Sequence, residues 1–159
     1  MSPENPDLND PAIWVEFAKS DLALARFGKH PEVRLGALCF HCQQAAEKSL
    51  KAVLMRHQIE FPPTHHLKTL FGLLPVPLSA PPDVMESIRL GEYILKGRYP
   101  MDFMDVTPRE YETALDLAGR VVKWAEKAVR DPDKPGGTLL KETPASYRAK
   151  KSRRKRGRK

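Results

Sequence analysis

The side chains best suited to chemistry gather on one face of a single predicted helix. The longest uninterrupted helical pattern runs from Arg34 to His57, and at about 100° per residue it brings together four polar residues: His41, Gln44, Lys48 and Lys51. Imidazole and amide groups hydrogen-bond a base or ribose, while ammonium groups meet phosphate. This face therefore suits an anion or a nucleotide, although any bundle helix presents polar residues opposite its apolar side.

The cysteines and the histidine pair favour neither a redox site nor a metal site. Cys39 and Cys42 form a CxxC inside the helical pattern, whereas a thioredoxin-like motif follows a strand and a zinc site needs a second ligand pair. His65 and His66 have no carboxylate or cysteine cluster nearby in the sequence. The chain also carries no Walker loop, GxGxxG or nucleophile elbow. We therefore expect reduced, structural thiols, no metal and no cofactor.

Five helices are expected to position these residues, over 11–28, 34–57, 65–74, 83–97 and 108–130. Asp10 followed by proline is a helix N-cap, and Thr107 with Glu110 forms a capping-box signature. Thr64 and Asp83 are the expected caps of the third and fourth helices, which a rigid proline-rich loop separates. The pattern predicts an all-α fold, an antiparallel bundle of four to five helices that occupies residues 1–130.

The apolar side of the long helix is the expected core seam, formed by Leu38, Cys42, Ala45, Ala46, Ser49, Leu50 and Val53. Asp21 falls among the apolar positions of the first helix, where a lone carboxylate is costly unless it meets a donor or a base. We expect Asp21 at the edge of the seam, and the alternative is a place in a functional groove. Glu47 and Lys51 have the spacing of a surface ion pair within one helix.

The basic character of the chain belongs to its C-terminal part. The net charge is +7, but residues 131–159 contain 11 basic and three acidic residues, which leaves the first 130 residues almost neutral. The segment 131–159 is expected to be a flexible tail, because its last part, Arg148 to Lys159, cannot bury its charge. Such an arm suits a polyanion such as nucleic acid, and the alternative is a tail that only aids solubility.

No membrane or secretory signal is recognisable in the sequence. No apolar run approaches the roughly 20 residues of a membrane span, and MSPENPDLND lacks the basic start and apolar centre of a signal peptide. We therefore expect a cytoplasmic protein with no membrane partner.

The order of these features resembles the HEPN domain (higher eukaryotes and prokaryotes nucleotide-binding). The resemblance rests on AKSDLALA in the first helix, on CFHCQQAAEKSLKAVLMRHQIEFPPTHHLKTLFGLL, and on a tyrosine-bearing helix that leads into RYP. It covers roughly residues 11–129 and implies an all-α bundle that is usually a homodimer around a groove. Prokaryotic members are often paired with a minimal nucleotidyltransferase in a toxin–antitoxin pair, and many members are metal-independent ribonucleases.

The resemblance also suggests which residues act. Polar groups of the family occur at positions that match His41, Gln44, Lys48, Lys51, His65, Arg98 and Tyr99, which implies a groove for a nucleotide or RNA. The ribonuclease branch uses an arginine, four to six residues and a histidine, but no histidine follows Arg98. Arg34 and His41 have this spacing at the start of the long helix and are the candidate catalytic pair. They would lie about 10 Å apart on one helix face, which is long for a single phosphate.

Three classes of function therefore remain open. The first is a nucleotide- or RNA-binding module that acts with a nucleotidyltransferase. The second is a ribonuclease toxin, in which His41 is the general base or acid and Arg34 holds the phosphate oxygens. The third is a bundle that serves only as a protein-interaction scaffold.

Overall fold

The protein is a bundle of helices arranged around one long central helix. The computed structural model describes residues 7–28, 30–100 and 105–131. Its α-helices are α1 (Pro11–Ala25), α2 (Leu35–Arg56), α3 (Leu67–Gly72), α4 (Pro82–Met85), α5 (Tyr93–Lys96) and α6 (Pro108–Arg130). Two 3-10 segments complete the chain order, η1 (Val76–Leu78) and η2 (Glu86–Glu92), and the described residues contain no strand. The predicted all-α bundle is confirmed.

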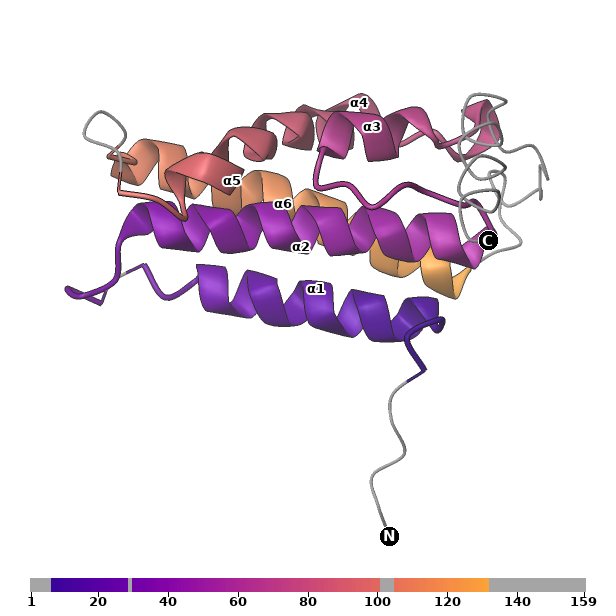
Figure 1. Cartoon of the computed structure of the whole chain (residues 1–159), viewed down its shortest axis with the longest axis horizontal. Helices are drawn as coiled ribbons and strands as arrows, with labels where there is room; N and C mark the ends of the chain where they lie inside the picture. The colour runs from indigo at the N-terminus through magenta and orange to yellow at the C-terminus, as the bar shows by residue number, and fades with distance from the viewer. Residues whose placement is uncertain (1–6, 29, 101–104, 132–159) are drawn as a thin grey trace, which may run out of the picture.

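Helix α2 lies at the centre and packs on α1, α6 and α5. Figure 1 shows α1 alongside α2, α6 behind α2, and the short helices α3 to α5 in a row on the other side of α2. The seven residues of the predicted seam are all buried: Leu38, Cys42, Ala45, Ala46, Ser49, Leu50 and Val53. The Tyr111 hydroxyl donates a hydrogen bond of 2.7 Å to the Ala25 carbonyl oxygen and so ties α6 to the end of α1.

The predicted starts of α1 and α6 are confirmed in atomic detail. The Asp10 side chain accepts a hydrogen bond of 2.8 Å from the Ala12 N–H. Thr107 and Glu110 form a capping box, because the Glu110 N–H donates to the Thr107 hydroxyl over 3.2 Å and the Thr107 N–H donates to the Glu110 carboxylate over 2.8 Å. Each cap satisfies backbone donors that the first helical turn leaves without a partner.

Helix α2 ends at Arg56, one residue before the predicted end at His57. Gln58 adopts the left-handed conformation with φ of 56°, and the Ile59 N–H donates a hydrogen bond of 2.8 Å to the Leu54 carbonyl oxygen. A second bond of 3.0 Å joins the Gln58 N–H to the Met55 carbonyl oxygen. These two bonds form a Schellman motif, which satisfies the last carbonyl groups of the helix.

The region 83–97 is not the single helix that was predicted. It consists of α4, η2 and α5, because its buried residues recur at every third position: Val84, Ser87, Leu90 and Tyr93. A 3-10 helix has three residues per turn and presents such a row to the core as one line. Asp83 lies in the first turn of α4 and does not cap it.

The cap of α3 also differs from the prediction. Helix α3 begins at Leu67 with His66 at the N-cap, and the Thr64 hydroxyl accepts a hydrogen bond of 3.1 Å from the His66 N–H. Thr64 therefore stabilises a turn that precedes the helix. The predicted flexible tail, 131–159, lies outside the described residues except for Asp131.

The thiols of Cys39 and Cys42 are fully buried and not bonded to each other. Burial raises the pKa of both thiols to about 12, so neither forms the reactive thiolate near neutral pH. We expect no reaction of the folded protein with a chromogenic disulfide reagent, and reaction of two thiols per chain after unfolding in urea. A Ser20→Cys variant, which adds an exposed thiol, is the positive control. Reaction of the native protein at the unfolded rate would contradict this prediction.

Candidate functional site

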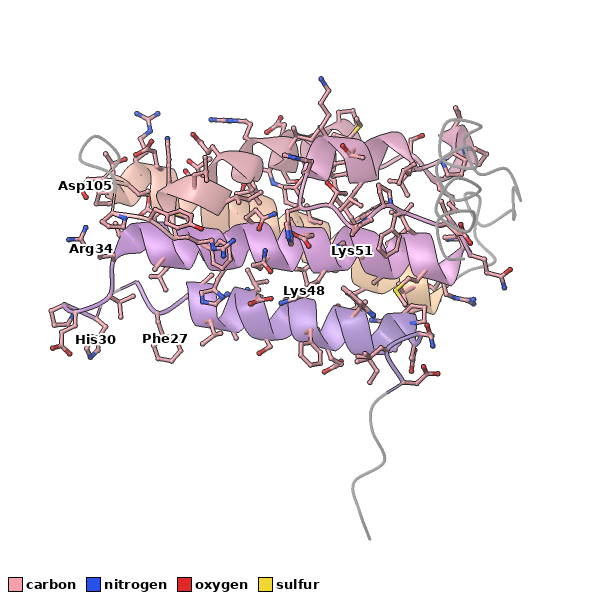
Figure 2. The ribbon with its side chains drawn as sticks, viewed as in Figure 1. Phe27, His30, Arg34, Lys48, Lys51 and Asp105 are labelled. Carbon is pink, nitrogen blue, oxygen red and sulfur yellow. The ribbon has the colours of Figure 1, made fainter. Side chains whose placement is uncertain are left out.

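The structure separates the predicted site residues into two groups along α2. Arg34, Arg98 and Tyr99 line an open depression of about 690 Å³ between the start of α2 and the segment after α5, which we call the Arg98 pocket. The second group follows α2 toward its end: His41, Gln44, Lys48 and Lys51, with His65 from the segment before α3. Figure 2 shows Arg34 near Asp105 at the start of α2, and Lys48 and Lys51 farther along the same helix.

Arg98 is the cation of the pocket that is best placed for an anionic ligand. Its guanidinium carbon lies 5.5 Å from the centre of the Phe40 ring and 5.7 Å from that of the Tyr99 ring. No carboxylate among the described residues lies within ion-pair distance of it, whereas Arg34 faces Asp105 at 3.8 Å and Lys96 faces Glu92 at 2.7 Å. The exposed Arg98 guanidinium is therefore oriented by aromatic rings and keeps its donors for a ligand.

Gly97 sets the position of the Arg98 pocket. A β-carbon on Gly97 would lie 2.5 Å from the Gly36 carbonyl oxygen and 2.4 Å from the Phe40 β-carbon. The end of α5 thus touches the backbone of α2, which is possible only without a side chain at position 97. This contact fixes the direction in which the chain leaves α5 and presents Arg98.

Asp21 is buried between α1 and α2, and it faces the polar side of α2. One carboxylate oxygen lies 2.9 Å from His41 Nδ1, and the other accepts a hydrogen bond from the Lys48 ammonium group. The carboxylate can only accept a hydrogen bond, so Nδ1–H is the donor, and in the neutral imidazole the Nε2 atom carries the free lone pair. About a third of the His41 side chain is exposed, which leaves the ring accessible to solvent and ligand.

Glu47 is the centre of a second buried cluster. Its carboxylate accepts hydrogen bonds from Lys51 over 2.7 Å, Gln43 over 3.2 Å and Gln44 over 3.3 Å, and it lies 3.1 Å from His65 Nδ1. Burial raises the pKa of the Glu47 carboxyl, but the hydrogen bond and charge of Lys51, with the bonds from Gln43 and His65, outweigh burial and hold this pKa below its ordinary value. The predicted Glu47–Lys51 pair exists, but it is buried rather than on the surface.

Lys51 has additional partners that hold it inside the protein. Its ammonium nitrogen lies 5.9 Å from the centre of the Trp14 ring and 5.8 Å from that of the Phe61 ring. Carboxylates therefore already neutralise both lysines of the candidate face, Lys48 through Asp21 and Lys51 through Glu47. These two lysines therefore hold the carboxylates of Asp21 and Glu47 in place, and their charge is not free for a ligand.

Phe40 joins the two groups of site residues. Its ring meets the His41 ring edge-on, with 5.8 Å between the ring centres. The Arg98 guanidinium also lies over the Phe40 ring. Arg98 and His41 thus flank one aromatic ring although they come from different parts of the chain. Phe40 was not among the predicted site residues, and the only signal for it in the sequence is its helical-wheel position beside the polar stripe. Arg34 and His41, the predicted catalytic pair, have different neighbours, Asp105 and Asp21.

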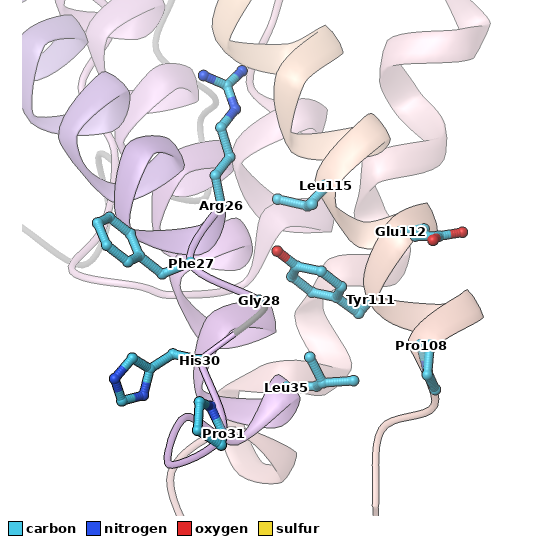
Figure 3. A pocket seen from close by; sticks show the side chains of 10 residues that line it. All are labelled: Arg26, Phe27, Gly28, His30, Pro31, Leu35, Pro108, Tyr111, Glu112 and Leu115. Atoms are coloured by element: carbon cyan, nitrogen blue, oxygen red, sulfur yellow. The ribbon is translucent and has the colours of Figure 1, made fainter.

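A second depression of about 750 Å³ lies between the end of α1 and the start of α6. Figure 3 shows that Leu35, Tyr111 and Leu115 border its interior, whereas the Phe27 and His30 rings project from the other side of the loop. Its lining is mainly apolar, and it contains none of the predicted site residues. The Arg98 pocket with the polar face of α2 is therefore the stronger candidate.

The described residues offer neither a metal site nor a membrane span. Within residues 7–28, 30–100 and 105–131, no three His, Cys, Asp or Glu side chains are grouped to hold a metal ion. None of the described helices combines the length and apolarity needed to cross a membrane. The candidate site thus consists of imidazole, guanidinium and amide groups above two carboxylates that are already paired.

The described helices form an all-α bundle, the fold class that the HEPN resemblance implies. The chain belongs to the HEPN family, because the sequence profile of the HEPN domain matches residues 12–128. A crystal structure of TT1696 from Thermus thermophilus is similar, with 29% identity and a TM-score of 0.62 over 76% of this chain and 98% of that chain. The structure of ST0689, an archaeal HEPN homologue, shares 26% identity with a TM-score of 0.57 over 75% and 97%. No curated protein matches the chain.

Proposed function

We propose that this HEPN protein binds a nucleotide or an RNA phosphate over Phe40, between Arg98 and His41. The observation that carries the proposal is the Arg98 guanidinium, which is exposed, rests on two aromatic rings and has no carboxylate partner among the described residues. Guanidinium groups hold phosphate with paired hydrogen bonds, and the exposed Tyr99 ring and the half-buried Phe40 ring offer surfaces for a base. The cytoplasm is the proposed location, and the basic tail from Arg148 to Lys159 adds affinity for polyanions.

The proposal includes a partner protein. This chain resembles prokaryotic HEPN proteins, which are often paired with a minimal nucleotidyltransferase. We therefore place it in a toxin–antitoxin type pair with such an enzyme. Co-expression with a nucleotidyltransferase encoded beside it, followed by affinity purification, tests this part. Recovery of the HEPN chain alone would exclude a stable pair.

Fluorescence anisotropy with labelled RNA and labelled nucleotides tests the ligand. Arg98→Ala should weaken binding by about tenfold or more, because a charge-assisted hydrogen bond is worth about 1.5–3 kcal/mol. Arg89→Ala removes another exposed arginine, one that lies outside the Arg98 pocket, and is the matched control. A chain that ends at Asp131 separates the contribution of the tail. Unchanged affinity of Arg98→Ala, with binding lost only when the tail is removed, would contradict the proposed site.

A second candidate function, ribonuclease activity, is favoured by the Asp21–His41 contact of 2.9 Å. This contact leaves His41 Nε2 free to accept the proton of an RNA 2′-hydroxyl, with Arg98 on the phosphate. The 2′-oxygen then bonds to phosphorus, the bond to the 5′-oxygen of the next nucleotide breaks, and that oxygen takes a proton from water. The products are a 2′,3′-cyclic phosphate and a 5′-hydroxyl end, and no co-reactant is needed.

RNA cleavage in the presence of a chelator distinguishes the two functions. If the protein is a ribonuclease, fragments should appear with the native protein and disappear with His41→Ala, while the folded fraction stays unchanged by circular dichroism. If the protein is a binding module, RNA should stay intact and shift in a gel. Fragments that persist with His41→Ala would assign the cleavage to another residue or to a contaminant.

A further inference from the structure

The outer side of α6 carries a row of cations near its C-terminal end. Lys123, Lys127 and Arg130 follow one another at steps of four and three residues. They therefore lie within about 60° on the helical wheel and extend about 10 Å along the helix. All three residues are exposed. The opposite side of α6 already provides the core contacts, through Ala118, Val121, Val122 and Ala125. The packing of the bundle thus does not require the row.

The charge of this row is only partly neutralised. Neither Lys123 nor Lys127 has a carboxylate within ion-pair distance among the described residues, and Arg130 faces Glu126 at 3.3 Å. Glu126 is shared, because it also accepts a hydrogen bond of 2.8 Å from Lys19 of α1. Basic residues in the last turn of a helix are favourable beside its negative C-terminal end, but Lys123 lies before that turn. Stabilisation of the helix alone therefore does not account for the row.

Arg56 adds a fourth cation from another helix. Its Nε atom donates a hydrogen bond of 3.2 Å to the Val129 carbonyl oxygen, which holds the half-buried side chain at the last turn of α6. Figure 1 shows that α2 and α6 end at the same end of the bundle. From there the chain continues into residues 131–159, which contain 11 basic and three acidic residues. We call Arg56, Lys123, Lys127 and Arg130 the α6 basic surface.

We infer that the α6 basic surface binds the phosphodiester backbone of a nucleic acid. A row of cations neutralises successive phosphates and releases their counterions, and about 10 Å is the length of roughly three nucleotides of one strand. The surface lies at the opposite end of the bundle from the Arg98 pocket, because α2 extends about 32 Å from Leu35 to Arg56. A mononucleotide in the Arg98 pocket cannot reach it. The inference therefore does not depend on the ligand proposed for that pocket.

The salt dependence of RNA binding tests the inference with the full chain. The probe is a labelled single-stranded RNA of about 20 nucleotides, long enough to contact the whole surface. Each phosphate contact of a single strand contributes about 0.7 to the slope of log K against log salt concentration. Replacing both Lys123 and Lys127 by alanine should therefore reduce the slope by about 1.4 and weaken binding about tenfold at about 0.1 M salt.

The matched control replaces Lys68 of α3 and Arg89 of η2 by alanine. It removes two exposed charges that also have no ion-pair partner within the described part of the chain, so the loss of net charge is the same. This control should leave the slope unchanged. Replacing Lys123 and Lys127 by arginine keeps the charge and should keep both slope and affinity. Equal slopes for the native protein and the alanine variant, or an equal loss in the control, would overturn the inference.

Two other ligands separate this surface from alternatives. Single-stranded DNA of the same sequence should show the same loss in the alanine variant, because the contacts are to phosphates. A labelled mononucleotide should bind the native protein and the alanine variant equally, and absence of mononucleotide binding would count against the Arg98 pocket alone. A loss confined to RNA would overturn backbone binding. A loss confined to anionic phosphatidylserine vesicles would overturn the inference in favour of a membrane surface.

Discussion

Replacing Glu47 by alanine is expected to lower the free energy of unfolding by about 3–5 kcal/mol, as for other buried ion pairs that lose one partner. The Lys51 ammonium group would then remain buried without a carboxylate, and Gln43 would lose an acceptor. Aromatic rings contact Lys51 but do not replace a charged acceptor. Urea denaturation monitored by circular dichroism measures the change.

The chain offers a matched control for this substitution. Glu92 and Lys96 form an ion pair with the same four-residue spacing and the same 2.7 Å distance, but the Glu92 side chain is about half exposed. Glu92→Ala should therefore cost only about 0.5 kcal/mol or less. Replacing both Glu47 and Lys51 by methionine should restore most of the stability, because no unpaired charge remains. Equal losses for Glu47→Ala and Glu92→Ala would show that burial does not matter for the pair.

Acid should remove the contribution of Glu47 in a defined pH range. The folded pKa of Glu47 lies below its ordinary value of 4.5, so around that pH the unfolded chain binds more protons than the folded one. The stabilisation is thus complete above about 4.5 and decreases as the pH falls through the lower folded pKa. Unfolding free energies of the native protein and Glu47→Gln, measured from pH 7 downward, should converge in this range. A constant difference between them would contradict the lowered pKa.

The three long helices could be predicted because their signals are local. The Asp10 cap, the Thr107–Glu110 capping box and the apolar seam of α2 each depend on residues a few positions apart. The region of α4, η2 and α5 was predicted as one helix because a short apolar pattern fits periods of 3.0 and 3.6 almost equally well. Packing of Ser87, Leu90 and Tyr93 against α2 and α6 decides for the shorter period.

The candidate site could be predicted only in part, since its key contacts are between distant segments. A helical wheel places Lys48 and Lys51 on the polar face of α2, but it does not show that Asp21 of α1 neutralises Lys48 or that Glu47 is buried. It also does not show that Arg98, 58 residues after Phe40, rests on the Phe40 ring. Whether a charged side chain on the polar face is free to bind a ligand depends on the residues that the neighbouring helices place against it.

Gly97→Ala is expected to disturb both the fold and the proposed binding site. The residue has an ordinary helical conformation with φ of −86°, so an added β-carbon causes no backbone strain of its own. The cost is steric, because that carbon would lie 2.4 to 2.9 Å from Phe40 and from the Gly36 and Tyr93 carbonyl oxygens. Overpacking of this kind lowers the free energy of unfolding by about 1–3 kcal/mol.

A comparison with Gly91→Ala separates the steric effect from the general effect of replacing glycine. A β-carbon at Gly91 would meet nothing within 4 Å, so Gly91→Ala should be neutral or should stabilise by up to about 1 kcal/mol. In Gly97→Ala, α5 must move away from α2, which also moves Arg98 off the Phe40 ring and weakens RNA or nucleotide binding. Denaturation and anisotropy should therefore show that stability and affinity both fall in Gly97→Ala, and that neither falls in Gly91→Ala. If Gly97→Ala lost stability but kept full affinity, Arg98 would not depend on the α5–α2 contact, and the ligand would have to be held elsewhere on α2.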